Sequence, residues 1–249
     1  MMKITFLGSG TSTGVPQIGC KCDTCLSEDP KDKRLRASVL IETERSGIII
    51  DIGPDFRQQL LQNPVQSISG ILLTHEHYDH IGGLDDVRPF GNVPVFAEKN
   101  VLNTIKRNMP YCFSENRYPG VPLIQLKEID ENDFYLNGEL ISPVRIMHAN
   151  LPALGFRIGN MAYLTDVKTL PDYSLEKLKN LDVLILNALR INKHISHLNL
   201  KEAQALAEII NAKRTIFTHM SHDMGRHAFI NSILPENQVL AYDNMTISF

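Results

Sequence analysis

The chain has 249 residues, of which 43% are hydrophobic and 21% charged, and its formal net charge is −3 with neutral histidines. These values fit a globular protein with a sizeable core and argue against a broad nucleic-acid-binding face. No apolar run approaches the roughly 20 residues of a membrane span, and residues 1–8 are too short and too soon broken by glycine for a signal peptide, so the cytoplasm is the expected compartment.

Residues 3–7 are predicted to form an opening strand, and a loop of small residues follows from Gly8 to Gly14. A glycine-rich loop after a strand can cradle phosphate. This loop has neither the G-x-G-x-x-G spacing nor the G-K-[ST] ending of nucleotide sites, so that interpretation is disfavoured. We interpret it as a tight turn that lets the chain pass close to the site formed further along.

Cys20, Cys22 and Cys25 form a C-x-C-x-x-C cluster. In a reducing compartment, clustered cysteines favour a metal site over disulfides. Three thiolates close a tetrahedral zinc site only with a fourth ligand from elsewhere in the chain. The alternative is a set of reduced thiols without a metal.

The charged run at residues 31–36 is interpreted as a solvated loop, with the alternative that Arg34 or Arg36 reaches an anionic substrate. A hairpin is predicted at residues 37–41 and 47–50, and a short helix at 55–63. Asp51, at the end of the hairpin, could support a ligand histidine or cap a turn.

The apolar run 68–73 indicates a buried strand, and His75, His77, Asp79 and His80 follow it as H-x-H-x-D-H. Imidazole and carboxylate together suit zinc, manganese or iron rather than calcium. Alternate residues of an extended segment point the same way, so His75 and His77 can hold one ion, while Asp79 and His80 could serve a second. The alternative, four solvated polar residues, is disfavoured because random composition seldom places three histidines so close.

An irregular aromatic stretch at residues 109–122 includes Tyr111 and Tyr118. It could roof the site, form a homodimer contact or anchor on the core, and Cys112 within it is expected to be a buried small hydrophobe. Before this stretch we predict a short helix starting near residue 82, a strand at 93–96 and a helix at 98–108.

Three further candidate ligands follow predicted strands in the second half of the chain: His148, Asp166 and His219. The strand at 139–147 leads to His148, and a hairpin turning at Gly159 and Asn160 leads to Asp166. No repeat, low-complexity segment or linker interrupts the chain, which predicts one domain over residues 1–249. The remaining predicted elements are helices at 175–181, 200–210 and 226–234, strands at 183–186 and 214–217, and two strands ending at Phe249.

The strand-then-ligand order of His75, His77, Asp79, His80, His148, Asp166 and His219 resembles the metallo-β-lactamase superfamily over essentially the whole chain. The resemblance implies an α/β fold, the αββα four-layer sandwich. It also implies a dinuclear site. One metal would be held by His75, His77 and His148, the other by Asp79, His80 and His219, with Asp166 bridging them.

The loop from Gly8 to Pro16, the cysteine cluster and the segment Thr218–Asp223 resemble the PhnP-type cyclic phosphodiesterases of phosphonate metabolism. This resemblance implies a structural zinc held by the three cysteines and His222. His227 is an alternative fourth ligand.

Two divalent ions about 3.5–4 Å apart can share a hydroxide and neutralise an attacked phosphodiester. Imidazoles with only two carboxylates leave the site net positive, which suits an anionic substrate. An alkoxide leaving group also needs a proton, and the resemblance indicates His197 as its donor, with Asp79 as the other catalytic residue. His194, in the same H-x-x-H context, is the weaker choice. The expected function is hydrolysis of a small, for example cyclic ribose, phosphodiester with zinc or manganese.

Four alternatives remain at this stage. A tRNA 3′-processing enzyme would carry a long Gly/Pro-rich arm, which this sequence lacks, and a protein of pyrroloquinoline quinone biosynthesis would often lose part of the ligand set. A β-lactamase would use a cysteine at the second metal, where this chain has Asp79 and Asp166. A non-catalytic scaffold would not need His197. Relatives often have aspartate at Asn187, expected near the general acid, which leaves the exact ester open.

Overall fold

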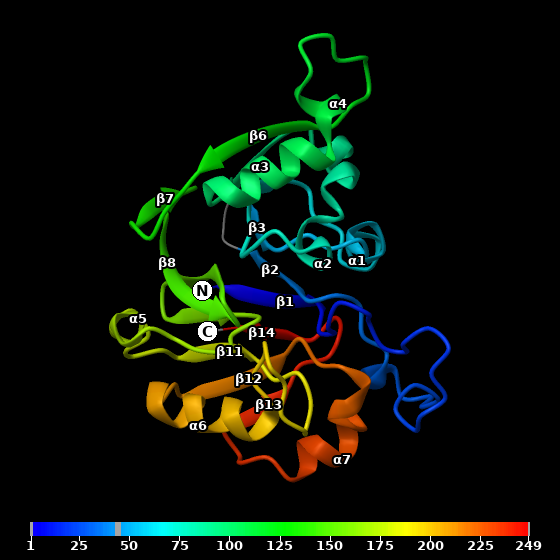
Figure 1. Ribbon diagram of the computed structural model, residues 1–249, viewed down its shortest axis with the longest axis vertical. Helices are drawn as coiled ribbons and strands as arrows, with labels where there is room; N and C mark the ends of the chain where they lie inside the picture. The colour runs from blue at the N-terminus through cyan, green and yellow to red at the C-terminus, as the bar shows by residue number, and fades with distance from the viewer. Residues whose placement is uncertain (1, 43–45, 249) are drawn as a thin grey trace.

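A computed structural model describes residues 2–42 and 46–248; the predicted end of the last strand at Phe249 lies outside this range. Two seven-stranded mixed sheets lie against each other, with helices on their outer faces (Figure 1). The predicted αββα sandwich is therefore confirmed. Within the described residues, no helix combines the length and apolarity that crossing a bilayer requires.

The first sheet has the order β14-β1-β2-β3-β4-β5-β6. Neighbouring strands are antiparallel from β14 to β3 and parallel from β3 to β6. The sequence pattern does not predict β6, because four of its six residues are exposed and polar residues interrupt it. The strands of this first sheet are β1 (Lys3–Gly8), β2 (Ser38–Glu42), β3 (Gly47–Ile50), β4 (Ile68–Leu72), β5 (Asn92–Ala97), β6 (Leu123–Glu128) and β14 (Thr246–Ser248).

The second sheet has the order β13-β12-β11-β10-β9-β8-β7. β10, β11, β12 and β13 run parallel, so their carboxyl ends meet at one edge. The predicted turn at Gly159 and Asn160 is confirmed, since Met161 of β10 pairs with Ile158 of β9. The strands are β7 (Phe134–Leu136), β8 (Glu139–His148), β9 (Leu151–Ile158), β10 (Met161–Leu164), β11 (Val183–Asn187), β12 (Arg214–Thr218) and β13 (Gln238–Leu240).

Alternating side chains of the first sheet enter two different cores. In β3, Ile48 and Ile50 pack between the sheets, whereas Ile49 packs beneath the outer helices. Successive side chains of a strand point to opposite faces, so a strand buried on both faces is apolar throughout. This arrangement explains why the strands next to the site appear in the sequence as unbroken apolar runs.

The helices divide between the two outer layers (Figure 1). α6 begins and ends as predicted and starts with a capping box in which Asn199 and Glu202 each accept the other's backbone N–H. The first layer holds α1 (Phe56–Gln62), α2 (Tyr78–Ile81), the 3₁₀ helix η2 (Leu84–Phe90), α3 (Lys99–Asn108) and α4 (Pro110–Phe113); the second holds α5 (Asp172–Glu176), α6 (Leu200–Ile210) and α7 (His227–Ser232), and the 3₁₀ helices η1 (Pro30–Asp32) and η3 (His222–Met224) lie in connecting loops.

The helix predicted at residues 175–181 is wrong, because α5 ends at Glu176. The carbonyls of Lys177 and Lys179 accept hydrogen bonds from the Arg157 guanidinium instead of helix amides. Asn180 also takes a left-handed backbone conformation, with φ of 57°. The hydrogen bonds from Arg157 of β9 thus end the helix. The sequence of residues 175–181 by itself does not indicate this partner.

The aromatic stretch after α3 anchors on the outer core. Tyr111 packs against that core, and Cys112 is fully buried, as expected. Tyr118 is 59% exposed, and the segment beyond α4 projects away from the sandwich (Figure 1). The core-anchoring interpretation therefore holds for Tyr111, and the homodimer contact stays a prediction.

The interpretation of residues 31–36 as a solvated loop is wrong at Asp32 and Arg34, which are both buried. Asp32 accepts the backbone N–H of His227, and Arg34 Nη1 lies 2.7 Å from the sulfur of Met220. Arg36 forms an ion pair with Asp55 at 3.0 Å. Charged residues are rarely buried without partners. Arg34 Nη2 lies 3.6 Å from Asp32, and the further contacts of this pair, with Met220 and His227, come from segments far away in sequence.

Candidate metal centre

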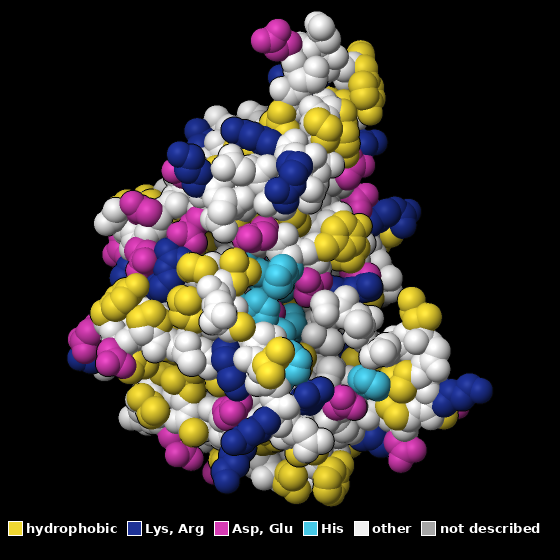
Figure 2. Space-filling model, in the orientation of Figure 1, with side chains coloured by type: hydrophobic (Ala, Val, Ile, Leu, Met, Phe, Trp, Pro, Cys, Tyr) yellow, Lys and Arg dark blue, Asp and Glu magenta, His cyan; other side chains and the backbone are white. Residues whose placement is uncertain are grey.

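Each of the seven residues predicted for the dinuclear site lies at the end of a strand or shortly after it, and the sandwich brings these strand ends together. Three residues at this edge, Asp51, Asp166 and His219, have left-handed backbones with φ of 62°, 57° and 57°. Such conformations cost about 1–3 kcal/mol each in non-glycine residues and occur often at functional sites. Figure 2 shows the histidine side chains gathered in a hollow near the middle of one face.

The ligand atoms of His75, His77 and His148 lie within 4.8 Å of one another, and so do those of Asp79, His80 and His219. These are the two sets that the family resemblance implies. Asp166 lies near both sets: its Oδ2 is 3.2 Å from His80 Nε2 and 3.3 Å from His219 Nε2, and it also has a carboxylate oxygen within 4.8 Å of a ring nitrogen of His75 and of His148. The structure therefore assembles all seven predicted ligands around one centre.

Several nitrogen atoms of this centre form no hydrogen bond of normal geometry with the protein, although carboxylate oxygens of Asp79 and Asp166 lie 3.2–3.6 Å from two of them. His80 Nε2 and both ring nitrogens of His219 are buried without a hydrogen bond among the described residues, although buried polar atoms normally have one. Burial opposes ionisation of Asp79 and Asp166, but the neighbouring imidazoles His80 and His219 hold both carboxyl pKa values well below the usual range. Unpartnered imidazole nitrogens beside ionised carboxylates fit divalent cations.

Asp51 orients one histidine of each set. Its Oδ2 lies 2.7 Å from His80 Nδ1, and it accepts the backbone N–H and the hydroxyl of Thr74. Since the Thr74 hydroxyl donates to Asp51, Thr74 Oγ1 accepts from His75 Nδ1 at 3.0 Å. Both histidines thus carry their proton on Nδ1 and present Nε2 to the centre. Asp51 therefore supports ligand histidines, the first of its two predicted roles.

We expect Asp51→Asn to weaken metal binding and activity about 10- to 100-fold, because an amide NH₂ would face the Nδ1–H of His80. Asparagine tolerates the left-handed backbone of Asp51, so the substitution adds no backbone strain. Metal affinity measured by chelator competition checks this, with the partly exposed Asp182→Asn as control. Unchanged affinity in Asp51→Asn would contradict the orienting role.

His197, the predicted proton donor, lies beside this centre. Its Nε2 is 2.8 Å from Asp166 Oδ1, and its ring centroid is 4.5 Å from that of His148. The preceding residue also supports the site, because His148 Nδ1 donates to the carbonyl of Ser196 at 2.9 Å. His194 lies one step further out, with Nδ1 3.1 Å from Nδ1 of His197.

Asn187 serves the backbone. Its Oδ1 accepts the N–H of Val167 at 2.7 Å, and its Nδ2 donates to the carbonyl of Val167 at 3.2 Å. That carbonyl also accepts the N–H of Leu198. Asn187 therefore fixes the residue after Asp166 and lies close to the chain that carries His197, as expected, but its role needs an amide that both donates and accepts. A carboxylate could not donate, so the amide of Asn187 suits this position.

The cysteine cluster is completed by His222. His222 Nδ1 lies 3.2 Å from Cys20 Sγ and 3.3 Å from Cys22 Sγ, and the ligand atoms of these residues and Cys25 are all within 4.8 Å. The Cys25 backbone N–H lowers the pKa of Cys22 to about 6, whereas burial raises that of Cys25 to about 11. This set of three thiols and an imidazole fits a tetrahedral zinc.

The alternative fourth ligand, His227, lies outside this cluster. It is buried, its ring centroid is 5.6 Å from that of Tyr242, and its Nδ1 has no hydrogen bond among the described residues. The family resemblance indicated His222 as the fourth ligand. Nothing in the local sequence distinguishes it from His227 as a partner for cysteines about two hundred residues earlier, so only the tertiary structure separates the two.

Burial lowers the pKa of His227 to about 4; Arg34 and Lys31 lower it further, while Asp32 and Asp29 oppose them. The imidazole of His227 therefore becomes protonated near pH 6.5 in the unfolded chain and only near pH 4 in the folded chain. Stability is lost as pH falls through that window, by about 3 kcal/mol at most. We expect His227→Gln to lose correspondingly less stability between pH 7 and 4.5, measured by urea unfolding. Parallel pH profiles for the two proteins would contradict this.

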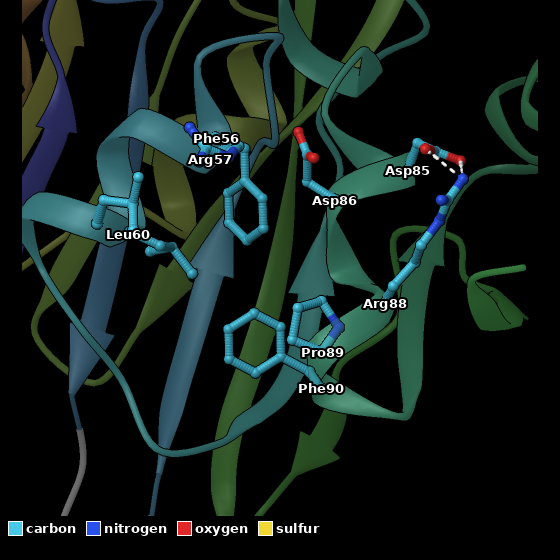
Figure 3. Close-up of a pocket in the computed structure, with 9 residues that line it drawn as sticks. Phe56, Arg57, Leu60, Asp85, Asp86, Arg88, Pro89 and Phe90 are labelled. Carbon is cyan, nitrogen blue, oxygen red and sulfur yellow. Dashed lines mark hydrogen bonds and ion pairs between the residues drawn. The ribbon is translucent and has the colours of Figure 1, made fainter. Parts of the chain in front are cut away.

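A separate cavity of about 400 Å³ lies between α1 and η2. Figure 3 shows Phe56, Leu60 and Phe90 around it, with Arg88 paired to Asp85 at its edge. Its lining contains no histidine or cysteine. This cavity is therefore distinct from the candidate metal centre.

Comparison with known proteins identifies the class of the chain. A family model described as a beta-lactamase superfamily domain matches residues 47–220, so the chain is a member of the metallo-β-lactamase superfamily. Within it, the chain belongs to the PhnP family. A crystal structure of a new diphosphatase from that family superposes with a TM-score of 0.94 and 39% identity, covering 100% of this chain and 97% of that one.

Two other relatives are more distant or differ in length. Zn²⁺-bound PqqB from Methylobacterium extorquens shares the fold, with a TM-score of 0.82 and 16% identity over 99% of this chain and all of that one. An octanoyltransferase from Porphyromonas gingivalis is 43% identical over 250 residues, covering 98% of this chain and 51% of that protein. The chain thus spans about half the length of this curated relative.

Proposed function

We propose that this protein is a dinuclear metal-dependent hydrolase of small phosphodiesters or diphosphates, working with zinc or manganese. The observation that carries the proposal is the pair of candidate ligand sets that meet at Asp166, with buried imidazole nitrogens that form no hydrogen bond among the described residues. The 39% identical relative described as a diphosphatase supports the same chemistry at phosphorus. The separate cluster of Cys20, Cys22, Cys25 and His222 is proposed to hold a structural zinc.

Two divalent cations bound here would supply Lewis acidity and lower the pKa of a water molecule at the centre. His75, His77 and His148 would hold one, and Asp79, His80 and His219 the other. In the reaction, the water oxygen forms a bond to phosphorus while the bond from phosphorus to the leaving oxygen breaks, its electron pair going to that oxygen. His197 gives the leaving oxygen a proton and recovers one from water.

The test is turnover of bis-p-nitrophenyl phosphate by the protein reconstituted with manganese or zinc. Activity should appear with about two equivalents beyond the structural zinc and disappear in Asp166→Ala, which loses the bridging carboxylate. Asp182→Ala, which removes a partly exposed carboxylate, should match the parent. A fully metallated parent that turns over neither this ester, nor a cyclic nucleotide, nor a diphosphate diester would overturn the proposal.

The activity in the name of the P. gingivalis relative is not carried over. That protein is about twice as long as the matched region. The central groups here contain only imidazoles and carboxylates, which suit metal-activated water better than acyl transfer. A nucleic-acid substrate is disfavoured by the net charge of −3.

A further inference from the structure

The cavity of about 400 Å³ between α1 and η2 has an apolar floor. Phe56 is buried, and Leu60 and Phe90 are partly buried and pack against the outer core. Figure 3 shows Phe56 and Leu60 on the α1 side of the cavity and Phe90 on the η2 side. Pockets for small molecules measure about 300–1,000 Å³ and are mostly apolar, with a few polar groups that fix the ligand. This floor therefore suits the apolar part of a small molecule.

The two walls of the cavity are tied together where they begin. Gly83 N–H donates to the carbonyl of Ile52 at 2.9 Å, and Ile52 N–H donates to the carbonyl of His80 at 2.8 Å. A Cβ at Gly83 would collide with the carbonyl oxygen of Gly53, so glycine allows the two backbones to approach this closely. The walls are thus fixed relative to each other at this end, as in a pre-formed pocket.

Four charged residues line the cavity, and two of them neutralise each other. Arg88 forms an ion pair with Asp85, which also accepts the hydroxyl of Tyr111. Arg57 of α1 and Asp86 of η2 remain. Neither side chain forms an ion pair or a hydrogen bond among the described residues, with each other or with a third group. The cavity therefore offers one unpaired positive charge and one unpaired negative charge, on opposite walls.

The surroundings of these two charges restrict what can bind. Asp86 is half-buried beside apolar side chains, so its carboxylate gains more from a charged donor than a fully exposed carboxylate would. Arg57 opposes the entry of a molecule that carries only positive charge, and Asp86 opposes one that carries only negative charge. A small molecule with both charges and an apolar body satisfies all three parts of the cavity.

We infer that this cavity is a binding site for a free α-amino acid with an apolar side chain. The ammonium group pairs with Asp86, the carboxylate pairs with Arg57, and the side chain lies on the apolar floor between Phe56 and Phe90. The site is separate from the candidate metal centre, and the inference does not rest on the proposed function.

The test is an NMR titration of the ¹⁵N-labelled, zinc-loaded protein with L-phenylalanine. Saturable shifts are expected in α1 and η2. Two analogues serve as matched ligands: 3-phenylpropionate lacks the ammonium group, and phenethylamine lacks the carboxylate. Each should bind about tenfold or more weakly than L-phenylalanine, because each leaves one charged side chain of the cavity unpaired.

Two variants separate a binding role of the charged side chains from a structural one. Asp86→Asn should weaken L-phenylalanine about tenfold without weakening 3-phenylpropionate, and Arg57→Gln should weaken L-phenylalanine without weakening phenethylamine. A distorted cavity would instead weaken every ligand alike, and that result would overturn the inference. Lys213→Gln removes an exposed cation outside the cavity and should bind like the parent.

An α-amino acid can also chelate a zinc ion through its amine and carboxylate, and the same titration detects this. Chelation at the metal centre would shift the resonances of residues 75–80 and would be insensitive to Asp86→Asn and Arg57→Gln. That pattern would overturn the inference. So would the absence of any shift in α1 and η2 at about 10 mM L-phenylalanine, which corresponds to a negligible affinity.

Discussion

His197→Ala is expected to lower kcat/KM for a 2′,3′-cyclic nucleotide by about 10²- to 10⁴-fold, the usual contribution of a positioned general acid. The leaving oxygen of that substrate is an aliphatic alkoxide, which leaves poorly without a proton. For bis-p-nitrophenyl phosphate the loss should be much smaller, because p-nitrophenol is a far stronger acid than a ribose hydroxyl. Steady-state kinetics on both esters, with metal content measured in parallel, checks this.

His194→Ala is the matched control, since this imidazole lies one step further from the metals. It should lose less activity on the cyclic nucleotide than His197→Ala. One ligand atom each of His197, His148 and Asp166 also lies within 4.8 Å of the other two. The same experiment therefore tests whether His197 is a metal ligand. Equal losses on both esters, accompanied by loss of a metal, would make His197 a ligand and remove it as the proton donor.

Cys22→Ser is expected to release about one zinc per chain and to lower the free energy of unfolding, on the order of 4 kcal/mol. Cys20, Cys25 and His222 would remain, but a three-ligand set binds zinc more weakly. Structural zinc supplies folding free energy directly. A zinc ion held by these residues would tie the loop before β2 to the segment three residues past His219. Elemental analysis and urea unfolding measure the two effects.

Cys112→Ala is the control, because Cys112 is buried in the outer core away from the cluster. It should lose stability through a cavity yet keep its zinc. If Cys22→Ser retains the zinc content of the parent, the structural site is rejected. Retained activity at reduced stability in Cys22→Ser would show that this site supports the fold and takes no part in the reaction.

The sequence determined the ligands of the candidate centre because their signal is local. Three imidazoles and a carboxylate within His75–His80 leave few chemical alternatives, and a strand predicted from apolar runs or from alternation places each further candidate at a strand end. The same locality explains why α6 was predicted at its observed bounds, since the capping residues Asn199 and Glu202 lie within its first turn.

Contacts between distant segments decided the rest. The burial of Arg34 depends on Met220, the end of α5 depends on Arg157 of β9, and the choice of His222 over His227 depends on where η3 meets the cysteines. The paired tautomers of His75 and His80 likewise depend on Asp51, which reaches them from another strand. Periodicity and spacing describe what a residue does to its own segment, whereas partners of buried polar groups are chosen by packing between sheets and loops.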